Sequence, residues 1–165
     1  MRSIIYILLS IFIIMGCEYK PSANFTNKTL GKRVYTDIDV SLSDPQNSVL
    51  IKDAIYKALY SRLNTTVTDK KRADSIIKVR YKSIKFKPLQ YDMHGYVIYY
   101  QADTTLDFIY IKNKKIIKKT ITSRYSFPIR PSAIISTSLR FEAIKNGSDR
   151  AIEQFIAYLS GLGLD

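Results

Sequence analysis

Cys17 carries the most reactive side chain of the sequence, and it is the only cysteine among 165 residues. A lone thiol cannot form a disulfide within the chain, which leaves covalent modification or an inert, buried role. The residue directly follows the apolar stretch Ile4–Met15 and Gly16. A thiol placed behind an apolar segment and a small residue is typical of a site that receives acyl chains at a membrane.

Residues 1–16 have the features of a cleaved signal peptide. Arg2 is the only charge, and the apolar run is shorter than the roughly 20 residues that span a bilayer. Ile14-Met15-Gly16-Cys17 resembles the lipobox, at which bacterial enzymes acylate the cysteine and cut before it. The alternative is an uncleaved anchor with a buried cysteine, and the short apolar run argues against it. We therefore expect a mature chain that begins at Cys17 and is held at a membrane by acyl chains.

The mature chain is basic and long enough for one domain. Removing Arg2 from the 26 basic residues leaves 25 against 14 acidic ones, a net charge of about +11. Residues 17–33 have no clear apolar period and are expected to form a tether, and residues 34–165 a single domain. A basic protein at a membrane seeks phosphates such as anionic lipid headgroups, whereas nucleic acid is not expected in the periplasm.

Candidate catalytic groups are sparse in this sequence. His94 is the only histidine, so any catalytic triad would have to use it, and its place beside Gly95 is typical of a solvated turn. Asp103 and Asp107 share a strand face but lie about 13 Å apart along a strand, too far for a carboxylate pair. Basic residues on neighbouring strands are expected to neutralise them. The sequence shows no metal-ligand spacing or phosphate-binding loop, so we expect no enzyme and no cofactor besides acyl chains on Cys17.

The clearest binding candidates are basic residues that alternate with apolar ones. If segments 77–82 and 117–127 are strands of one sheet, their charges converge on the face that the helices leave uncovered. These residues are Lys78, Arg80, Lys82, Lys118 and Arg124. Converging cations would bind a phosphorylated glycolipid, arginine through bidentate contacts and lysine as a point charge. A solvated face whose charges prevent aggregation is the alternative interpretation.

Apolar periodicity predicts the elements that position these residues. Alternation of polar and apolar side chains predicts strands at 34–40, 77–87, 96–110 and 117–127. Apolar spacings of three and four predict helices at about 49–63 and 138–159. The apolar phase switches near Ser83 or Ile84, which predicts a bulge, and residues 88–95 are expected to form a loop.

The predicted fold class is α+β, a two-layer sandwich with the order strand, helix, three strands, helix. Its four-stranded mixed sheet would carry both helices on its apolar face, and the first two strands would be linked by a crossover if they are parallel neighbours. The last two strands should form a hairpin. If Asn113 and Lys114 form its turn, facing residue numbers add up to 227, the sum of 113 and 114, which places Asp103 opposite Arg124.

Several short motifs occur at specific places relative to the predicted helices and strands. They are Cys17-Glu18-Tyr19-Lys20-Pro21 after the signal, Ser48–Ala54 opening the first helix, Ala73-Asp74 before the second strand, and Pro88–Asp92 with Gly95-Tyr96 before the third. Together with the predicted element order, they resemble the LPS-assembly lipoprotein family LptE, in a form similar to that of the epsilon-proteobacterial lineage. Glu18 stands where that family typically has glycine.

The resemblance implies a non-enzymatic partner of the outer-membrane barrel LptD, seated in its lumen as a plug and aiding its assembly. It also implies binding of lipopolysaccharide on its way to the outer leaflet. Large barrels have polar interiors, which agrees with a polar, charged plug. No aspartate follows Cys17, so the inner-membrane retention signal of such lipoproteins is missing and the outer membrane is the expected location. The alternative function is a free-standing, periplasmic-facing lipoprotein that binds an anionic envelope polymer, and a hydrolase is a more distant one.

Overall fold

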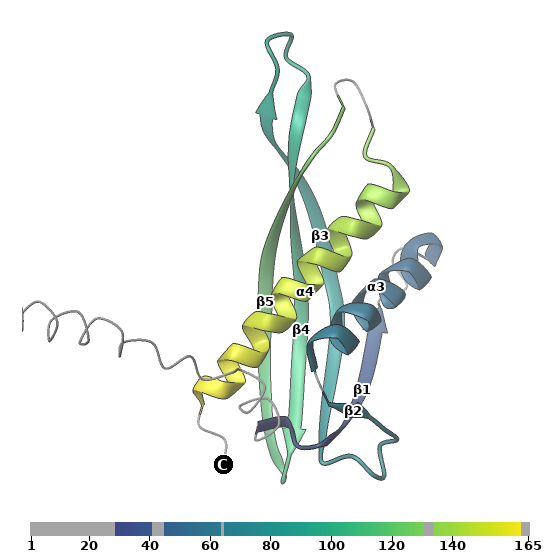
Figure 1. The fold of residues 1–165 in the computed structure, drawn as a ribbon, viewed down its shortest axis with the longest axis vertical. Coiled ribbons are helices and arrows are strands. Elements are labelled where there is room, and N and C mark those ends of the chain that lie inside the picture. Colours follow the sequence, from purple (N-terminus) through teal and green to yellow (C-terminus); the bar gives the residue numbers. More distant parts are fainter. Residues whose placement is uncertain (1–28, 41–44, 64, 131–133, 163–165) are drawn as a thin grey trace, which may run out of the picture.

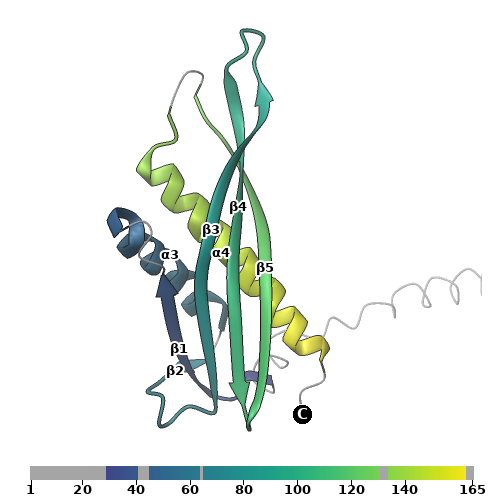
Figure 2. The same ribbon diagram turned by 180° about the vertical axis from the view of Figure 1, so that it is seen from behind.

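The computed structural model of the protein describes residues 29–40, 45–63, 65–130 and 134–162. The strands are β1 (Arg33–Val40), β2 (Thr66–Val67), β3 (Ser75–Tyr91), β4 (Val97–Lys112) and β5 (Lys115–Pro128), and the helices are α3 (Pro45–Leu63) and α4 (Thr137–Gly161). Both helices lie across one face of a long, twisted sheet (Figure 1). In the view from behind, the other face is not covered by any described element (Figure 2).

The sheet has the strand order β2-β1-β3-β4-β5. Strand β1 runs parallel to β2 and β3, whereas β4 is antiparallel to both β3 and β5. The α+β class, the mixed sheet and the parallel crossover from β1 through α3 to β3 are therefore confirmed. The predicted number of four strands is wrong, because the sheet has five. The additional strand, β2, contains only two residues, too few for an alternating pattern to indicate it.

The predicted loop at residues 88–95 is wrong in its first half, because β3 continues to Tyr91. Pairing with β1 ends at Tyr81, so no described strand pairs with this edge of β3 beyond that residue. A proline is tolerated on such an edge because its missing N–H leaves no ladder bond unmade there. The pairing with β4 is irregular after Pro88, and the strand ends in a turn in which Asp92 Oδ1 accepts hydrogen bonds from the backbone N–H groups of His94 and Tyr96.

The predicted bulge is present, one residue earlier than expected. The register of β3 with β4 shifts between Tyr81 and Ser83, which leaves Lys82 as the extra residue. Before the shift Tyr81 faces Leu106, and after it Ile84 faces Thr104, so apolar side chains point to the helices on both sides of the bulge. The bulge therefore explains the phase switch in the sequence.

The predicted hairpin between β4 and β5 is confirmed pair by pair. Asp103 lies opposite Arg124, and Tyr110 lies opposite Ile117, as a turn at Asn113-Lys114 requires. Both turn residues have positive φ angles, 48° and 64°, which a two-residue type I′ turn needs. A slip of one residue would turn every core side chain of β5 toward solvent, so burial holds the register as well.

The helices bury the apolar stripes that the sequence predicts. The buried residues of the two helices include Ile51, Ala54, Ile55, Ala58 and Leu59 in α3, and Ile144, Ala151, Ile152, Phe155 and Leu159 in α4. Phe155 stacks on Phe108 of β4 with ring centroids 4.4 Å apart. Helix α3 begins at Pro45, earlier than predicted, and proline suits a first helical turn because its missing N–H would be unpaired there. Helix α4 is capped by Ser136, whose side chain accepts a hydrogen bond from the backbone N–H of Leu139.

The packed region begins before residue 34, within the segment expected to be a tether. Leu30 is only 1% exposed and belongs to the main core cluster. Its carbonyl accepts a hydrogen bond of 2.5 Å from the Ser75 hydroxyl, and the Thr29 carbonyl accepts one of 2.5 Å from the Tyr110 hydroxyl. Burial raises the pKa of Tyr110 to about 12, so this hydroxyl remains a donor at neutral pH. These contacts fix where the described chain enters the domain.

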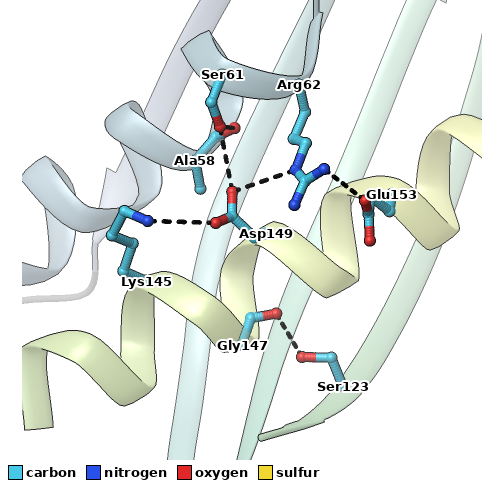
Figure 3. Close-up of polar contacts among 8 residues, drawn as sticks. All are labelled: Ala58, Ser61, Arg62, Ser123, Lys145, Gly147, Asp149 and Glu153. Carbon is cyan, nitrogen blue, oxygen red and sulfur yellow. Dashed lines mark hydrogen bonds and ion pairs between the residues drawn. The ribbon is translucent and has the colours of Figure 1, made fainter. Parts of the chain in front are cut away.

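A nearly buried carboxylate joins the two helices (Figure 3). Asp149 of α4 accepts a hydrogen bond from the Ser61 hydroxyl of α3 and lies 3.6 Å from the Arg62 guanidinium and 3.5 Å from the Lys145 ammonium group. Arg62 also pairs with Glu153 at 2.6 Å. A buried charge is tolerated only with such partners, so this cluster fixes how α3 lies along α4.

Helix α4 crosses the sheet most closely at Gly147. A Cβ atom at this position would lie 2.3 Å from Thr104 Oγ1 and 2.8 Å from Thr104 Cβ. The Ser123 hydroxyl donates a 2.5 Å hydrogen bond to the Gly147 carbonyl (Figure 3), which ties the helix backbone to β5. Only glycine therefore fits where α4 meets β4 and β5.

We expect Gly147→Ala to destabilise the domain by about 1–3 kcal/mol, because the new methyl group overlaps the β-carbon of Thr104 and forces the helix outward. Gly161→Ala is the matched control, since nothing lies within 4 Å of a Cβ at that end of the same helix. The free energy of unfolding in urea measures both variants. An unfolding free energy for Gly147→Ala equal to or above that of the control would contradict the close crossing.

Candidate functional site

The uncovered face of the sheet carries the five basic residues predicted to bind lipopolysaccharide. Lys78 and Arg80 project from β3 beside β1, and Lys118 and Arg124 project from β5. Lys82 occupies the bulge, and its ammonium group still reaches this face, 3.9 Å from the Asp107 carboxylate of β4. All five are therefore brought to one surface, which we call the open face and define by these residues together with Asp37, Asp39, Asp103 and Asp107.

Carboxylates on neighbouring strands neutralise part of the charge on the open face. Asp39 pairs with Arg80 at 2.8 Å, and Asp37 lies 4.0 Å from Lys78. These two pairs follow from the parallel register of β1 with β3, in which Asp37 faces Lys78 and Asp39 faces Arg80. Alternation along residues 34–40 places both aspartates on the polar face of that strand, but it does not predict their pairing. These strands were predicted to be adjacent and parallel, and that prediction could have revealed the pairing of the aspartates with Lys78 and Arg80.

Asp103 and Asp107 are neutralised by basic residues of β3, as expected from the sequence. Lys87 donates a 2.6 Å hydrogen bond to Asp103, and Lys82 lies 3.9 Å from Asp107. The hydrogen bond from Lys87 lowers the pKa of the Asp103 carboxyl from its ordinary value of 3.8. The hydrogen bond from Gln101 and the charge of Arg124 lower this pKa further, whereas burial opposes them. Asp103 therefore stays ionised well into the acidic range.

Lys118 and Arg124 differ from the other cations of the open face. Neither side chain forms an ion pair within the part of the chain that the structure describes. Arg124 faces Asp103 in the register, but Lys87 and Gln101 already occupy the oxygens of that carboxylate at 2.6 Å each. These two residues of β5 are thus the cations of the candidate site that are most available to a ligand.

Hydroxyl groups fill the space between the charges. Thr105 and Thr122 share a hydrogen bond of 2.9 Å between their hydroxyls, and the Thr120 hydroxyl donates to Asp107 at 2.6 Å. A shallow depression of about 560 Å³ lies over the middle of this face and is lined in part by Asp37, Asp39, Lys78, Arg80, Asp107, Lys118 and Thr120. The open face therefore offers both charges and hydrogen-bond donors in this depression, whose lining also includes the apolar residue Ile109.

Other predicted functional residues lie elsewhere or outside the described ranges. His94 is exposed in the turn after β3, where the sequence predicts a solvated residue. Among the described residues, no group of three or more His, Cys, Asp or Glu side chains could hold a metal ion. Cys17, the predicted site of acylation, lies outside these residues. None of the helices described is long and apolar enough to cross a membrane.

Comparison with known proteins identifies one family. A family model for lipopolysaccharide assembly, LptE, matches residues 35–159. Among solved structures, rare lipoprotein B from Shewanella oneidensis aligns with 15% identity and a TM-score of 0.47, over 78% of this chain and 98% of that chain. A lipoprotein B from Nitrosomonas europaea aligns with 13% identity and a TM-score of 0.49, over 80% of this chain and 84% of that chain. The search of curated proteins gives no match.

We expect a nuclear magnetic resonance titration to find the Asp103 pKa below 3.8, and Lys87→Met to raise it because the main hydrogen bond is lost. Lys85→Met is the matched control, since Lys85 faces Asp103 in the register but forms no ion pair with any described residue. A folded-state pKa below the unfolded value means that the pair stabilises the fold above pH about 4 and that this contribution disappears as the pH falls through the folded-state pKa. An unchanged Asp103 pKa in Lys87→Met would contradict this assignment.

Proposed function

The chain belongs to the lipopolysaccharide-assembly family LptE, and we propose that it is an outer-membrane lipoprotein that sits within an LptD-type barrel. In this role it assists the assembly of the barrel and binds lipopolysaccharide that is being transported to the outer leaflet. The observation that carries the proposal is the family match, which extends from β1 through nearly all of α4. In this proposal the protein acts by binding, without catalysis or a cofactor, and acyl chains on Cys17 hold it at the membrane.

The composition of the open face supports the role of a plug. The lumen of a large outer-membrane barrel is polar and hydrated. A domain that occupies it needs polar contacts on the surface that its own helices leave uncovered. The open face supplies them as aspartate, lysine and arginine side chains separated by threonine hydroxyls. A flat apolar sheet face would instead lie against water or polar groups at a cost of about 25 cal/mol for each Å² exposed.

The ion pairs of the open face leave its cations accessible to phosphate. Side chains in these pairs are largely half-exposed, for example 63% for Arg80 and 59% for its partner Asp39. Such surface pairs contribute only about 0–1 kcal/mol each. A phosphate group forms bidentate, charge-assisted hydrogen bonds with arginine that are stronger than these surface ion pairs. A phosphate can therefore displace the aspartate carboxylate from the arginine. The pairs would hold the cations in place without blocking a phosphorylated ligand.

Two cations should contribute most to lipopolysaccharide binding. Lys118 and Arg124 have no carboxylate to release first within the described part of the chain, whereas Lys78, Arg80 and Lys82 each lie within 4.0 Å of one. We infer that a lipid phosphate meets β5 first and then recruits the three paired cations of β3. The same unpaired cations would serve a free-standing lipoprotein that binds an anionic envelope polymer, which is the competing proposal.

Co-purification separates these two proposals. The acylated chain, tagged at its C-terminus and extracted from the outer membrane in detergent, is expected to bring down a large barrel protein that mass spectrometry identifies. A tagged lipoprotein of another family serves as the control for adventitious recovery. Isolation of the chain with lipopolysaccharide or another anionic polymer, but with no barrel protein, would refute the plug and favour the free-standing binder.

Charge reversal tests the ligand contacts. We expect Lys118→Glu/Arg124→Glu to weaken lipopolysaccharide binding at least about tenfold, because a hydrogen bond to a charged group contributes about 1.5–3 kcal/mol. The loss should exceed that of Arg80→Glu/Lys82→Glu, since those cations already have carboxylate partners. Lys52→Glu/Lys57→Glu on α3 makes the same change in net charge on the helix side. If the β5 and α3 double variants bound lipopolysaccharide with equal affinity at low salt, the open face would be a solvated surface and not a binding site.

A further inference from the structure

The end of the molecule where the described chain begins is strongly basic. Three segments meet there, at the lower end of the sheet in Figure 1: residues 29–33, the loop 68–74 before β3, and the turn 112–115 between β4 and β5. The Lys112 ammonium group donates to the Thr29 carbonyl at 2.9 Å, and the Asp74 backbone N–H donates to the Arg33 carbonyl at 2.8 Å, which joins the three segments. Together they form what we call the basic end.

The basic end contains eight basic residues and two acidic ones. The basic residues are Lys32, Arg33, Lys70, Lys71, Arg72, Lys112, Lys114 and Lys115. Both carboxylates are already used, because Asp69 pairs with Arg72 at 2.7 Å and Asp74 pairs with Arg33 at 3.0 Å while accepting backbone hydrogen bonds from residues 32 and 33. The excess positive charge at this end is therefore not compensated by the described residues.

Several of these cations have no role in holding the fold. Lys70 and Lys71 are exposed in the loop before β3, and Lys114 and Lys115 are exposed at the tip of the β4–β5 turn. None of these four side chains forms an ion pair or a hydrogen bond with another described residue. Solvated ammonium groups that are concentrated at one end of an elongated domain repel one another. Contact with an anionic surface would reduce this repulsion.

The basic end also contains the first described part of the chain after the predicted lipid anchor. Thr29 is twelve residues from Cys17, and a fully extended chain of that length spans at most about 40 Å. The opposite end, the tip between β3 and β4, lies roughly 50 Å further along the strands, since β4 has 16 residues at about 3.3 Å each. An anchor at Cys17 therefore confines the basic end, but not the tip, close to the membrane surface.

We propose that, before the domain enters a barrel, the basic end is its docking surface for anionic phospholipid headgroups, so that the free domain stands on this end with its strands directed away from the membrane. The inference rests on acylation of Cys17, which belongs to the proposed function. Acyl chains then supply one membrane signal and the basic end a second, electrostatic one. Each lysine near an anionic surface raises the equilibrium constant for docking by about fivefold. The lipid tether also raises the effective concentration of the basic end at the membrane.

Fluorescence energy transfer from the two ends of the domain to the membrane tests this orientation. Acylation occupies the thiol of Cys17, so a single cysteine introduced as Ile116→Cys near the basic end or Met93→Cys at the tip can be labelled alone; these side chains are 59% and 92% exposed. The acylated protein is reconstituted on phosphatidylcholine vesicles, with or without phosphatidylglycerol, that carry acceptor lipids. We expect phosphatidylglycerol to increase transfer from the label at position 116 and not from that at position 93.

Charge variants and salt provide the controls. Lys71→Glu/Lys115→Glu should lower the docked fraction on phosphatidylglycerol vesicles by more than tenfold, whereas Lys52→Glu/Lys57→Glu on α3 should leave it unchanged. Salt at about 1 M, with a Debye length of about 3 Å, should abolish the effect of phosphatidylglycerol. Equal transfer from position 116 on both kinds of vesicle would overturn the docking surface. If the protein dissociated from phosphatidylcholine vesicles, that result would instead contradict the anchor. In that case, increased energy transfer from position 116 on vesicles that contain phosphatidylglycerol would still support docking.

Discussion

The register of the β4–β5 hairpin is the constraint on which the remaining structure depends. Two consecutive residues with left-handed backbone angles, Asn113 and Lys114, close the turn and fix every pair from Lys112–Lys115 to Tyr99–Pro128. Because side chains alternate along a strand, this single choice sends Leu106 and Ile121 toward the helices and Asp103 and Arg124 to the opposite side. The core side chains of β4 and β5 and their part of the candidate site are therefore consequences of one turn.

The two faces of the sheet meet different physical demands. The covered face must fit the helices closely, which it does through aromatic stacking at Phe108 and a glycine contact at Gly147. The open face must stay soluble without a cover, and it balances cations on β3 and β5 against carboxylates on β1 and β4. This balance is incomplete on β5, where Lys118 and Arg124 lack ion-pair partners in the described part of the chain. The asymmetry gives the open face a defined place for an anionic ligand.

Periodicity in the sequence was enough to predict much of this arrangement. The long alternation from Tyr96 to Tyr110 and the apolar stripe of α4 each extend over many residues, so burial dominates local preference there. Features that depend on a few residues or on partners distant in sequence were missed. Strand β2 contains two residues, and the continuation of β3 through Pro88 depends on its having lost β1 as a neighbour.

The candidate site was predictable in position but not in its electrostatics. Alternation alone places Lys78, Arg80, Lys118 and Arg124 on one face. The partners of Lys78 and Arg80 are set by the parallel register of β1, which no local pattern contains. The entry of Leu30 into the core could not be expected either, because residues 17–33 show no period and its burial depends on tertiary contacts with the main core cluster and with Ser75.

We propose that the uncovered polar face of the sheet binds lipopolysaccharide. Site-specific photo-crosslinking in growing cells tests it most directly, with a photoreactive amino acid at the exposed Thr122 on the open face or at Tyr60, which is 68% exposed on α3. We expect an adduct with lipopolysaccharide from position 122 and none from position 60. An adduct from position 60 with none from position 122 would contradict it, because the ligand would then lie on the helix side of the domain.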